Sequence, residues 1–153
     1  MEFAGCAFEA VNGGLYSGML KEPDIYCADY GEAADTAGAF FSPDKRYYGR
    51  YEPAIVINTR AIGAMVEAGA FLNVYEGILD TMAHEAVHYW CWLNDVNDTD
   101  EQGAHNELFR VAAIAHGLEC EERDGSWGAT ALSLYGAIAT QGHLTAEALD
   151  DML

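Results

Sequence analysis

The chain has 153 residues, about half of them apolar, and its 25 acidic residues outnumber seven basic ones to give a formal charge of −18. This length predicts a single domain, residues 1–153, with a hydrophobic core of its own. A surface this negative repels phosphate backbones and anionic lipids, so we expect no direct binding to nucleic acid or to membranes.

The sequence also bears on the compartment. No stretch approaches the roughly 20 apolar residues of a membrane span, and no basic segment precedes an apolar one near Met1, so no signal peptide is predicted. The cysteines at positions 6, 27, 91 and 120 form no C-x-x-C pair. We interpret them as buried thiols in a reducing compartment, which predicts a cytoplasmic protein, although their spacing leaves a disulfide open.

The first half of the chain alternates between helical and strand-like patterns. Apolar residues recur at helical spacing near the N-terminus, and three short apolar runs are separated by turn residues. The predicted elements are a helix from Phe3 to about Asn12, strands at Ile25–Ala28, Ala37–Phe41 and Ala54–Asn58, a short helix over Thr59–Ala68 and a long helix over about Asn73–Leu93. We expect the first two strands to pair antiparallel.

The second half is predicted to be helical. An acidic loop, Asn94–Glu101, leads to a helix over about Ala104–His116, and the segment "EERDGSWG" is expected to be a turn. Two further short helices are predicted at Thr130–Gln141 and Ala146–Leu153, the second with Thr145 as its N-cap. The fold class is therefore α+β, with a small three-stranded, mostly antiparallel sheet packed on the N-terminal helix and the long helix, and with a helical C-terminus.

The long helix contains the pattern H-E-x-x-H, formed by His84, Glu85 and His88. Residues four apart lie on one face of a helix, so both imidazoles can bind a single metal ion. Glu85 lies on a neighbouring face, from which a carboxylate can act as general base toward a water held at the metal. This spacing predicts a catalytic zinc site rather than a chance grouping of core residues.

A catalytic zinc ion in such a site takes three protein ligands and keeps one position open. Our choice for the third ligand is His105, because the loop after the long helix can turn the chain back toward His84 and His88. Glu107 is the alternative, and His116 is expected to cap the end of its helix. The other candidates are His143 and four acids of the loop: Asp95, Asp98, Asp100 and Glu101. Asp80, one turn before His84, is a candidate for orienting the imidazoles. The tyrosines at positions 47, 48, 75 and 135 are open candidates for stabilising an oxyanion.

Several short motifs occur in an order and spacing that resemble the SprT-like zinc metallopeptidases, over about residues 3–117. The chain matches the patterns of that family in "VNGGLYSGML", "TAGAFF", "AIVIN", "HEAVHYW" and "HNELF". The resemblance implies a zincin-like fold, one Zn²⁺ per chain bound by His84, His88 and His105, and Glu85 as the catalytic glutamate. It implies an endopeptidase that uses a zinc-bound water.

The chain departs from that family in two respects. Many members carry a C-terminal zinc ribbon of paired C-x-x-C motifs, whereas residues 118–153 here form a divergent extension without them. Members that act on DNA-linked proteins have basic regions, and this chain is acidic. The expected substrate is therefore a peptide or protein, neutral or basic in charge, and not one bound to DNA.

Two other hypotheses compete with the hypothesis that the protein is an enzyme. The charge of −18 is also typical of a polyanion mimic, a non-enzymatic acidic binding protein on a zincin scaffold that occupies the basic cleft of another protein. Alternatively, Cys91 could fill the fourth position of a purely structural zinc site. Glu85 favours catalysis, because neither alternative needs a carboxylate at that position.

Overall fold

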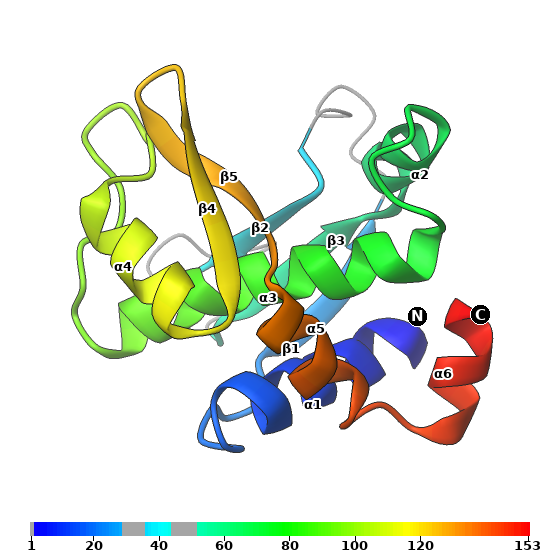
Figure 1. The fold of residues 1–153 in the computed structure, drawn as a ribbon. Helices are drawn as coiled ribbons and strands as arrows, with labels where there is room; N and C mark the ends of the chain where they lie inside the picture. Colours follow the sequence, from blue (N-terminus) through cyan, green and yellow to red (C-terminus); the bar gives the residue numbers. More distant parts are fainter. Residues whose placement is uncertain (1, 29–35, 44–51) are drawn as a thin grey trace.

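The helix α3, Val74–Leu93, runs through the middle of the molecule and carries the H-E-x-x-H motif (Figure 1). The computed structural model of the chain describes residues 2–28, 36–43 and 52–153. Asn73 caps the helix, because its side-chain oxygen accepts the backbone N–H of Glu76 at 2.9 Å. A side-chain acceptor at this position satisfies one of the N–H groups that the first turn leaves unpaired, and the predicted start near Asn73 is confirmed.

Six helices and five strands lie within the described residues. The helices are α1 (Glu2–Leu15), α2 (Thr59–Glu67), α3, α4 (Glu107–Ala115), α5 (Leu134–Gln141) and α6 (Ala146–Met152). The strands are β1 (Asp24–Ala28), β2 (Gly38–Phe41), β3 (Ala54–Asn58), β4 (Leu118–Arg123) and β5 (Ser126–Leu132). All the helices and the first three strands were predicted, although three helix boundaries differ by more than one residue. α1 continues past Asn12 to Leu15, α4 begins at Glu107 rather than Ala104, and α5 begins at Leu134 rather than Thr130.

The three-stranded sheet has the order β1-β3-β2, and this order corrects the predicted pairing. β1 runs parallel to β3, with Ile25 opposite Ile55, and β2 runs antiparallel to β3. The first two strands are therefore not neighbours, and the sheet is not mostly antiparallel. The reason lies in β3, whose five residues are all buried. A strand buried along its whole length is suited to the centre of a sheet, not to an edge.

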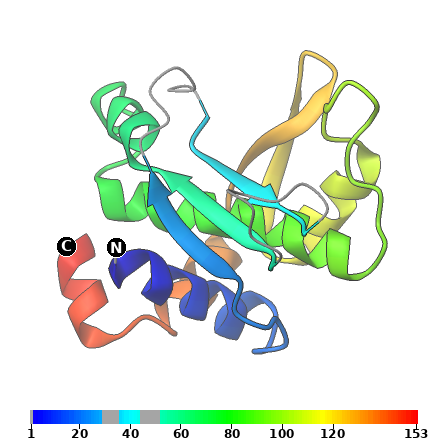
Figure 2. The ribbon, with the colours of Figure 1, turned by 180° about the vertical axis from the view of Figure 1, so that it is seen from behind.

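The three-stranded sheet lies on one side of α3 and the remaining strands lie on the other, as the front and rear views show (Figures 1 and 2). One cluster of buried side chains joins α1, β3 and α3, and includes Phe8, Val11, Ile57, Ile78 and Met82. The predicted packing of the sheet with the N-terminal helix and the motif helix is confirmed to this extent. It fixes α3 from below and leaves the His84 and His88 side uncovered by α1.

The region after Leu118 is not wholly helical, and this is the second correction. Strands β4 and β5 form an antiparallel hairpin, with Leu118 opposite Leu132. Its turn is the dipeptide Asp124-Gly125, and both residues have positive φ angles, of 52° and 79°. Asp-Gly with two positive φ angles is the two-residue turn that connects antiparallel strands. The helices α5 and α6 follow the hairpin, and Thr145 is the N-cap of α6 as predicted.

Three further predictions have separate outcomes. The four cysteines, all within the described residues, form no disulfide. Among the described helices, none combines the length and the apolar character needed to cross a membrane. Most of the two turn segments predicted between the first three strands, together with Tyr47 and Tyr48, lies outside the described residues.

Candidate metal centre

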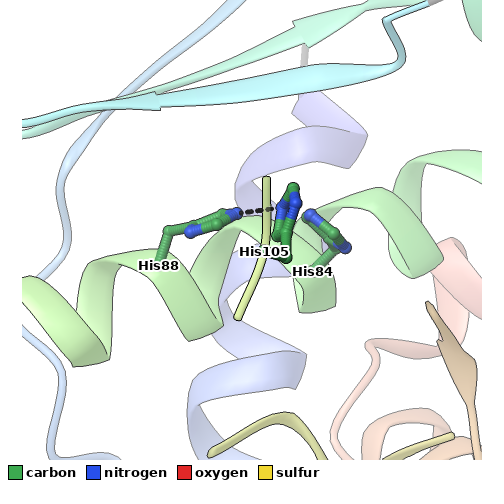
Figure 3. Close-up of side chains that lie close together, drawn as sticks. All are labelled: His84, His88 and His105. Carbon is green, nitrogen blue, oxygen red and sulfur yellow. Dashed lines mark hydrogen bonds between the residues drawn. The ribbon is translucent and has the colours of Figure 1, made fainter. Parts of the chain in front are cut away.

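The structure brings His84, His88 and His105 together, although His105 is distant from the other two in sequence (Figure 3). One ring nitrogen from each histidine lies within 4.8 Å of the other two. The shortest separation is 3.0 Å, between Nε2 of His88 and Nε2 of His105. Among the described residues, these three histidines form the group of potential metal ligands whose donor atoms lie this close together.

The position of His105 is set by its backbone rather than by a helix. It precedes α4, whose N-cap is Asn106, so the prediction that His105 lies in the first turn of that helix is wrong. The side chain of Asn106 accepts the N–H of Phe109 and donates to the carbonyl of Asn97 at 2.7 Å. Asn106 therefore ties the start of α4 to the acidic loop, and this brings His105 back over α3.

The second ring nitrogen of each imidazole faces an oxygen. Nδ1 of His84 lies 2.7 Å from Oγ1 of Thr130, and Nδ1 of His88 lies 2.6 Å from Oδ2 of Asp98. Nδ1 of His105 lies 3.3 Å from Oγ of Ser126. An oxygen that accepts the Nδ1 proton leaves the lone pair on Nε2, which is the state of a histidine that binds a metal.

The protonation states fit the same role. Burial lowers the pKa of His84 well below its ordinary value, and the neighbouring charges of His88 and His105 lower it further. Burial, with the charge of His88, lowers the pKa of His105 to about 4. Both rings are therefore neutral near neutral pH, and a neutral imidazole has the lone pair that a metal ion requires.

The spacing of the histidine nitrogens can be compared with the spacing of nitrogen ligands around a zinc ion. Nitrogen ligands at 2.0–2.1 Å from a tetrahedral zinc ion are about 3.3 Å apart, close to the 3.0 Å between the His88 and His105 nitrogens. The His88 and His105 nitrogens are thus at the spacing of two zinc ligands, and a nitrogen of His84 lies within 4.8 Å of both. The alternative ligands lie outside the cluster: Glu107 is exposed and pairs with Arg110, and Cys91 is buried, with a pKa raised to about 12 by burial.

Glu85 lies in the same cleft as the three histidines, although its side chain is only 5 % exposed. Burial raises its pKa to about 7, and the nearby Asp98 adds to that effect while His88 opposes it. Gly38 of β2 packs directly above this residue: a Cβ atom built there would lie 3.3 Å from Cγ of Glu85. Glu85 is therefore held between α3 and β2 in a state that can take up and release a proton near pH 7.

The cleft around these residues has a volume of about 970 Å³. Its floor is α3, with His84, Glu85 and His88, and its two walls are β2 and β5. Phe71, Phe40 and Trp92 are among its apolar lining residues. A cleft of this size, lined by apolar groups around a few polar ones, is large enough for a ligand.

The other predicted residues have different positions. Asp80 also lines the cleft, but it accepts the backbone N–H of Leu132 at 2.9 Å and so fastens β5 to α3 rather than orienting an imidazole. His116 ends α4 as predicted, with its Nδ1–H donated to the carbonyl of Ala112. Burial lowers its pKa, so it caps the helix as a neutral ring. Tyr75 packs against Phe3, and Tyr135 is exposed on α5.

Sequence reasoning missed the partners of the imidazoles. Asp98 was considered as a possible metal ligand from the acidic loop and not as the partner of an imidazole, and Ser126 and Thr130 fell in a region predicted to be turn and helix. The Asp-Gly dipeptide at 124–125, with apolar and acidic residues alternating before it, was the signal of a hairpin that could have placed them.

Comparisons of the chain with protein-family models, with curated proteins and with solved structures found no match of any of the three kinds. The family resemblance suggested by the motifs therefore stays a prediction, and the interpretation of the site depends on its own geometry.

Proposed function

We propose that the chain is a zinc-dependent endopeptidase of zincin-like fold, with a SprT-like catalytic domain. The observation that carries this proposal is the position of Glu85: a buried carboxylate lines the same cleft as three converging imidazoles. Three neutral imidazoles and an adjacent carboxylate are the groups that metal-assisted hydrolysis uses.

His84, His88 and His105 would hold the zinc ion. When bound, a zinc ion acts as a Lewis acid that lowers the pKa of its water ligand to about 7 and polarises a carbonyl oxygen. Glu85 takes a proton from the water that attacks the peptide carbonyl and then gives it to the leaving amine. In the metal-free protein, burial raises the pKa of this carboxyl to about 7, and an effective general base has a pKa near the working pH.

Two features support a peptide as the substrate. β2 is the outer strand of its sheet among the described residues and forms one wall of the cleft, so its open edge can pair with an extended peptide. Apart from the histidines, the described ionisable side chains that line the cleft are three carboxyl groups and one arginine: Asp80, Glu85, Asp98 and Arg123. Together with the overall charge of −18, they favour peptides that are neutral or basic.

The test uses Glu85→Gln beside Glu107→Gln, with quenched fluorescent peptides of neutral and of lysine-rich sequence. We expect Glu85→Gln to retain zinc and to lose kcat/KM by at least about 100-fold, because it removes the general base and no metal ligand. Glu107→Gln is the matched control, since Glu107 is exposed outside the cleft. It should match the parent in both zinc content and cleavage.

Three outcomes separate the interpretations. Cleavage by Glu85→Gln at the parental rate would refute the mechanism. Loss of zinc from Glu107→Gln would mean that Glu107 replaces one of the histidines as ligand. A parent protein that binds zinc and cleaves none of the peptides would contradict the peptidase and favour the acidic binding protein as the alternative.

A further inference from the structure

The strand β5 meets the metal centre along one of its faces. Ser126, Gly128 and Thr130 are alternate residues of β5, and side chains two apart in a strand point to the same side. Ser126 and Thr130 each place a hydroxyl beside an imidazole, and Gly128 lies between them against the ring of His105. Three consecutive positions of one strand face thus contact two of the three histidines.

Thr130 makes the shortest of these contacts between a hydroxyl and an imidazole. Its Oγ1 lies 2.7 Å from Nδ1 of His84, a ring that also packs beside Phe109 with centroids 5.2 Å apart. If the ring donates its Nδ1 proton to Thr130, the Nε2 lone pair faces the other two histidines. If the proton were on Nε2 instead, it would point into the centre and prevent His84 from binding a metal.

His105 is held by the same strand through three groups. The backbone N–H of Trp127 donates to the His105 carbonyl at 2.9 Å, and the His105 N–H donates to Oγ of Ser126 at 3.0 Å. A Cβ atom built on Gly128 would lie 2.7 Å from Nδ1 of His105 and 3.0 Å from its Cε1. The ring therefore occupies the space that any side chain at position 128 would need.

We propose that β5 positions the metal centre: Thr130 and Ser126 fix the Nε2 lone pairs of His84 and His105 toward the ion, and Gly128 leaves the room in which the His105 ring is seated. This proposal rests on the proposed zinc site. According to this proposal, residues 126–130 are part of the metal centre, whereas the sequence predicted that they belong to a divergent extension outside it. Asp80 supports the arrangement, because it fastens the far end of β5 to α3 at Leu132.

The experiment measures affinity for Zn²⁺ by competition with a chromophoric chelator, and the visible absorption of the Co²⁺-substituted protein, on the full chain. Thr130→Val removes the hydroxyl with little change of shape, and Thr130→Ser restores it. Ala131→Val, at an exposed position of the same strand, is the control for the introduction of a valine into β5. Gly128→Ala is paired with Gly63→Ala, because a Cβ atom at Gly63 meets no atom within 4 Å.

We expect Thr130→Val to weaken zinc binding by about 10- to 100-fold, since loss of a hydrogen-bond partner of a metal-binding histidine has this effect. Thr130→Ser and Ala131→Val should bind within about threefold of the parent by the same reasoning. Gly128→Ala should weaken binding and alter the Co²⁺ spectrum, because the His105 ring must move, whereas Gly63→Ala should do neither. Far-UV circular dichroism checks that each variant folds.

The outcomes are distinguishable from those of the peptidase test. If His84→Ala loses zinc while Thr130→Val and Gly128→Ala both bind like the parent, the role of β5 is refuted and the zinc centre stands. If the parent itself binds neither Zn²⁺ nor Co²⁺, both proposals fall. If Thr130→Val does not fold, Gly128→Ala against Gly63→Ala decides the question alone.

Discussion

Replacement of Gly38 by alanine tests the contact between β2 and α3 that holds Glu85 in place. A Cβ atom at Gly38 would lie 2.6 Å from Cγ2 of Thr81, 3.1 Å from the carbonyl oxygen of Val56 and 3.3 Å from Cγ of Glu85. Real Cβ atoms do not approach other atoms to 2.6 Å, so the strand or the helix must shift. Added bulk in a packed interior lowers the free energy of unfolding by about 1–3 kcal/mol, and we expect a loss in this range.

A second substitution shows whether Thr81 is the cause. Thr81→Ser deletes the Cγ2 methyl group, which alone is expected to lower the free energy of unfolding by about 1 kcal/mol. Combined with Gly38→Ala it should recover part of the loss, with a favourable coupling of at least about 1 kcal/mol. The free energies come from urea unfolding followed by tryptophan fluorescence, with Gly63→Ala as control.

Two results would refute this reasoning. If Gly38→Ala unfolds at the same urea concentration as the parent, β2 is not packed against Thr81. If the double mutant loses the sum of the two single losses to within about 0.5 kcal/mol, the two sites are independent. In either case the position of Glu85 beneath β2 would have to be revised.

Two further changes follow from the contacts around the site. Burial raises the pKa of Asp80 to about 6 from its ordinary 3.8, so its ionisation in the folded, metal-free protein removes up to about 3 kcal/mol of stability as the pH rises from about 4 through 6. Asp80→Asn keeps an oxygen for the Leu132 N–H, so in EDTA it should be more stable than the parent at about pH 8 and lose that advantage at about pH 4. A difference that is equal at both values would contradict the burial of this carboxyl. Asn106→Ala should lower the free energy of unfolding by about 1–2 kcal/mol, because the cap of α4 is lost. In the same urea assay Asn106→Asp should recover only part of it, because the carboxylate keeps the cap but cannot donate to the Asn97 carbonyl.

Much of the fold could be predicted because helices are encoded locally. α3 has an apolar stripe, an Asn cap at position 73 and a second asparagine, Asn94, directly after its last turn, and all three can be recognised within a single segment. The order of the sheet could not be predicted in the same way. β1 and β3 pair in parallel although the segment containing β2 separates them in the chain, and the choice depends on which strand is covered on both faces. Propensity contains no information about that.

The same difference between local and long-range information applies to the candidate site. His84, Glu85 and His88 follow from one helix, and His105 follows from the need for a third ligand after a loop. Their hydrogen-bond partners come from Asp98 and from a hairpin that returns to α3 only after α4. The sequence contains the hairpin's Asp-Gly turn, but nothing local shows that the face of β5 carrying Thr130 meets His84. Contacts of this kind depend on tertiary packing and not on spacing.

The acidic composition is compatible with a polyanion mimic and with a hydrolase, and the burial of Glu85 is an argument between the two. A polyanion mimic needs charges that a partner can reach, and Glu85 is only 5 % exposed and one of 25 acidic residues. A carboxylate in that position is unfavourable, because its pKa is raised from 4.5 to about 7 by burial, which amounts to about 3 kcal/mol against the ionised form. An inert scaffold would be more stable with glutamine there, whereas a hydrolase needs the ionisable group. Glu85→Gln should therefore stabilise the metal-free protein at about pH 8 while it abolishes cleavage, and a binding protein would show the first effect with no loss of function.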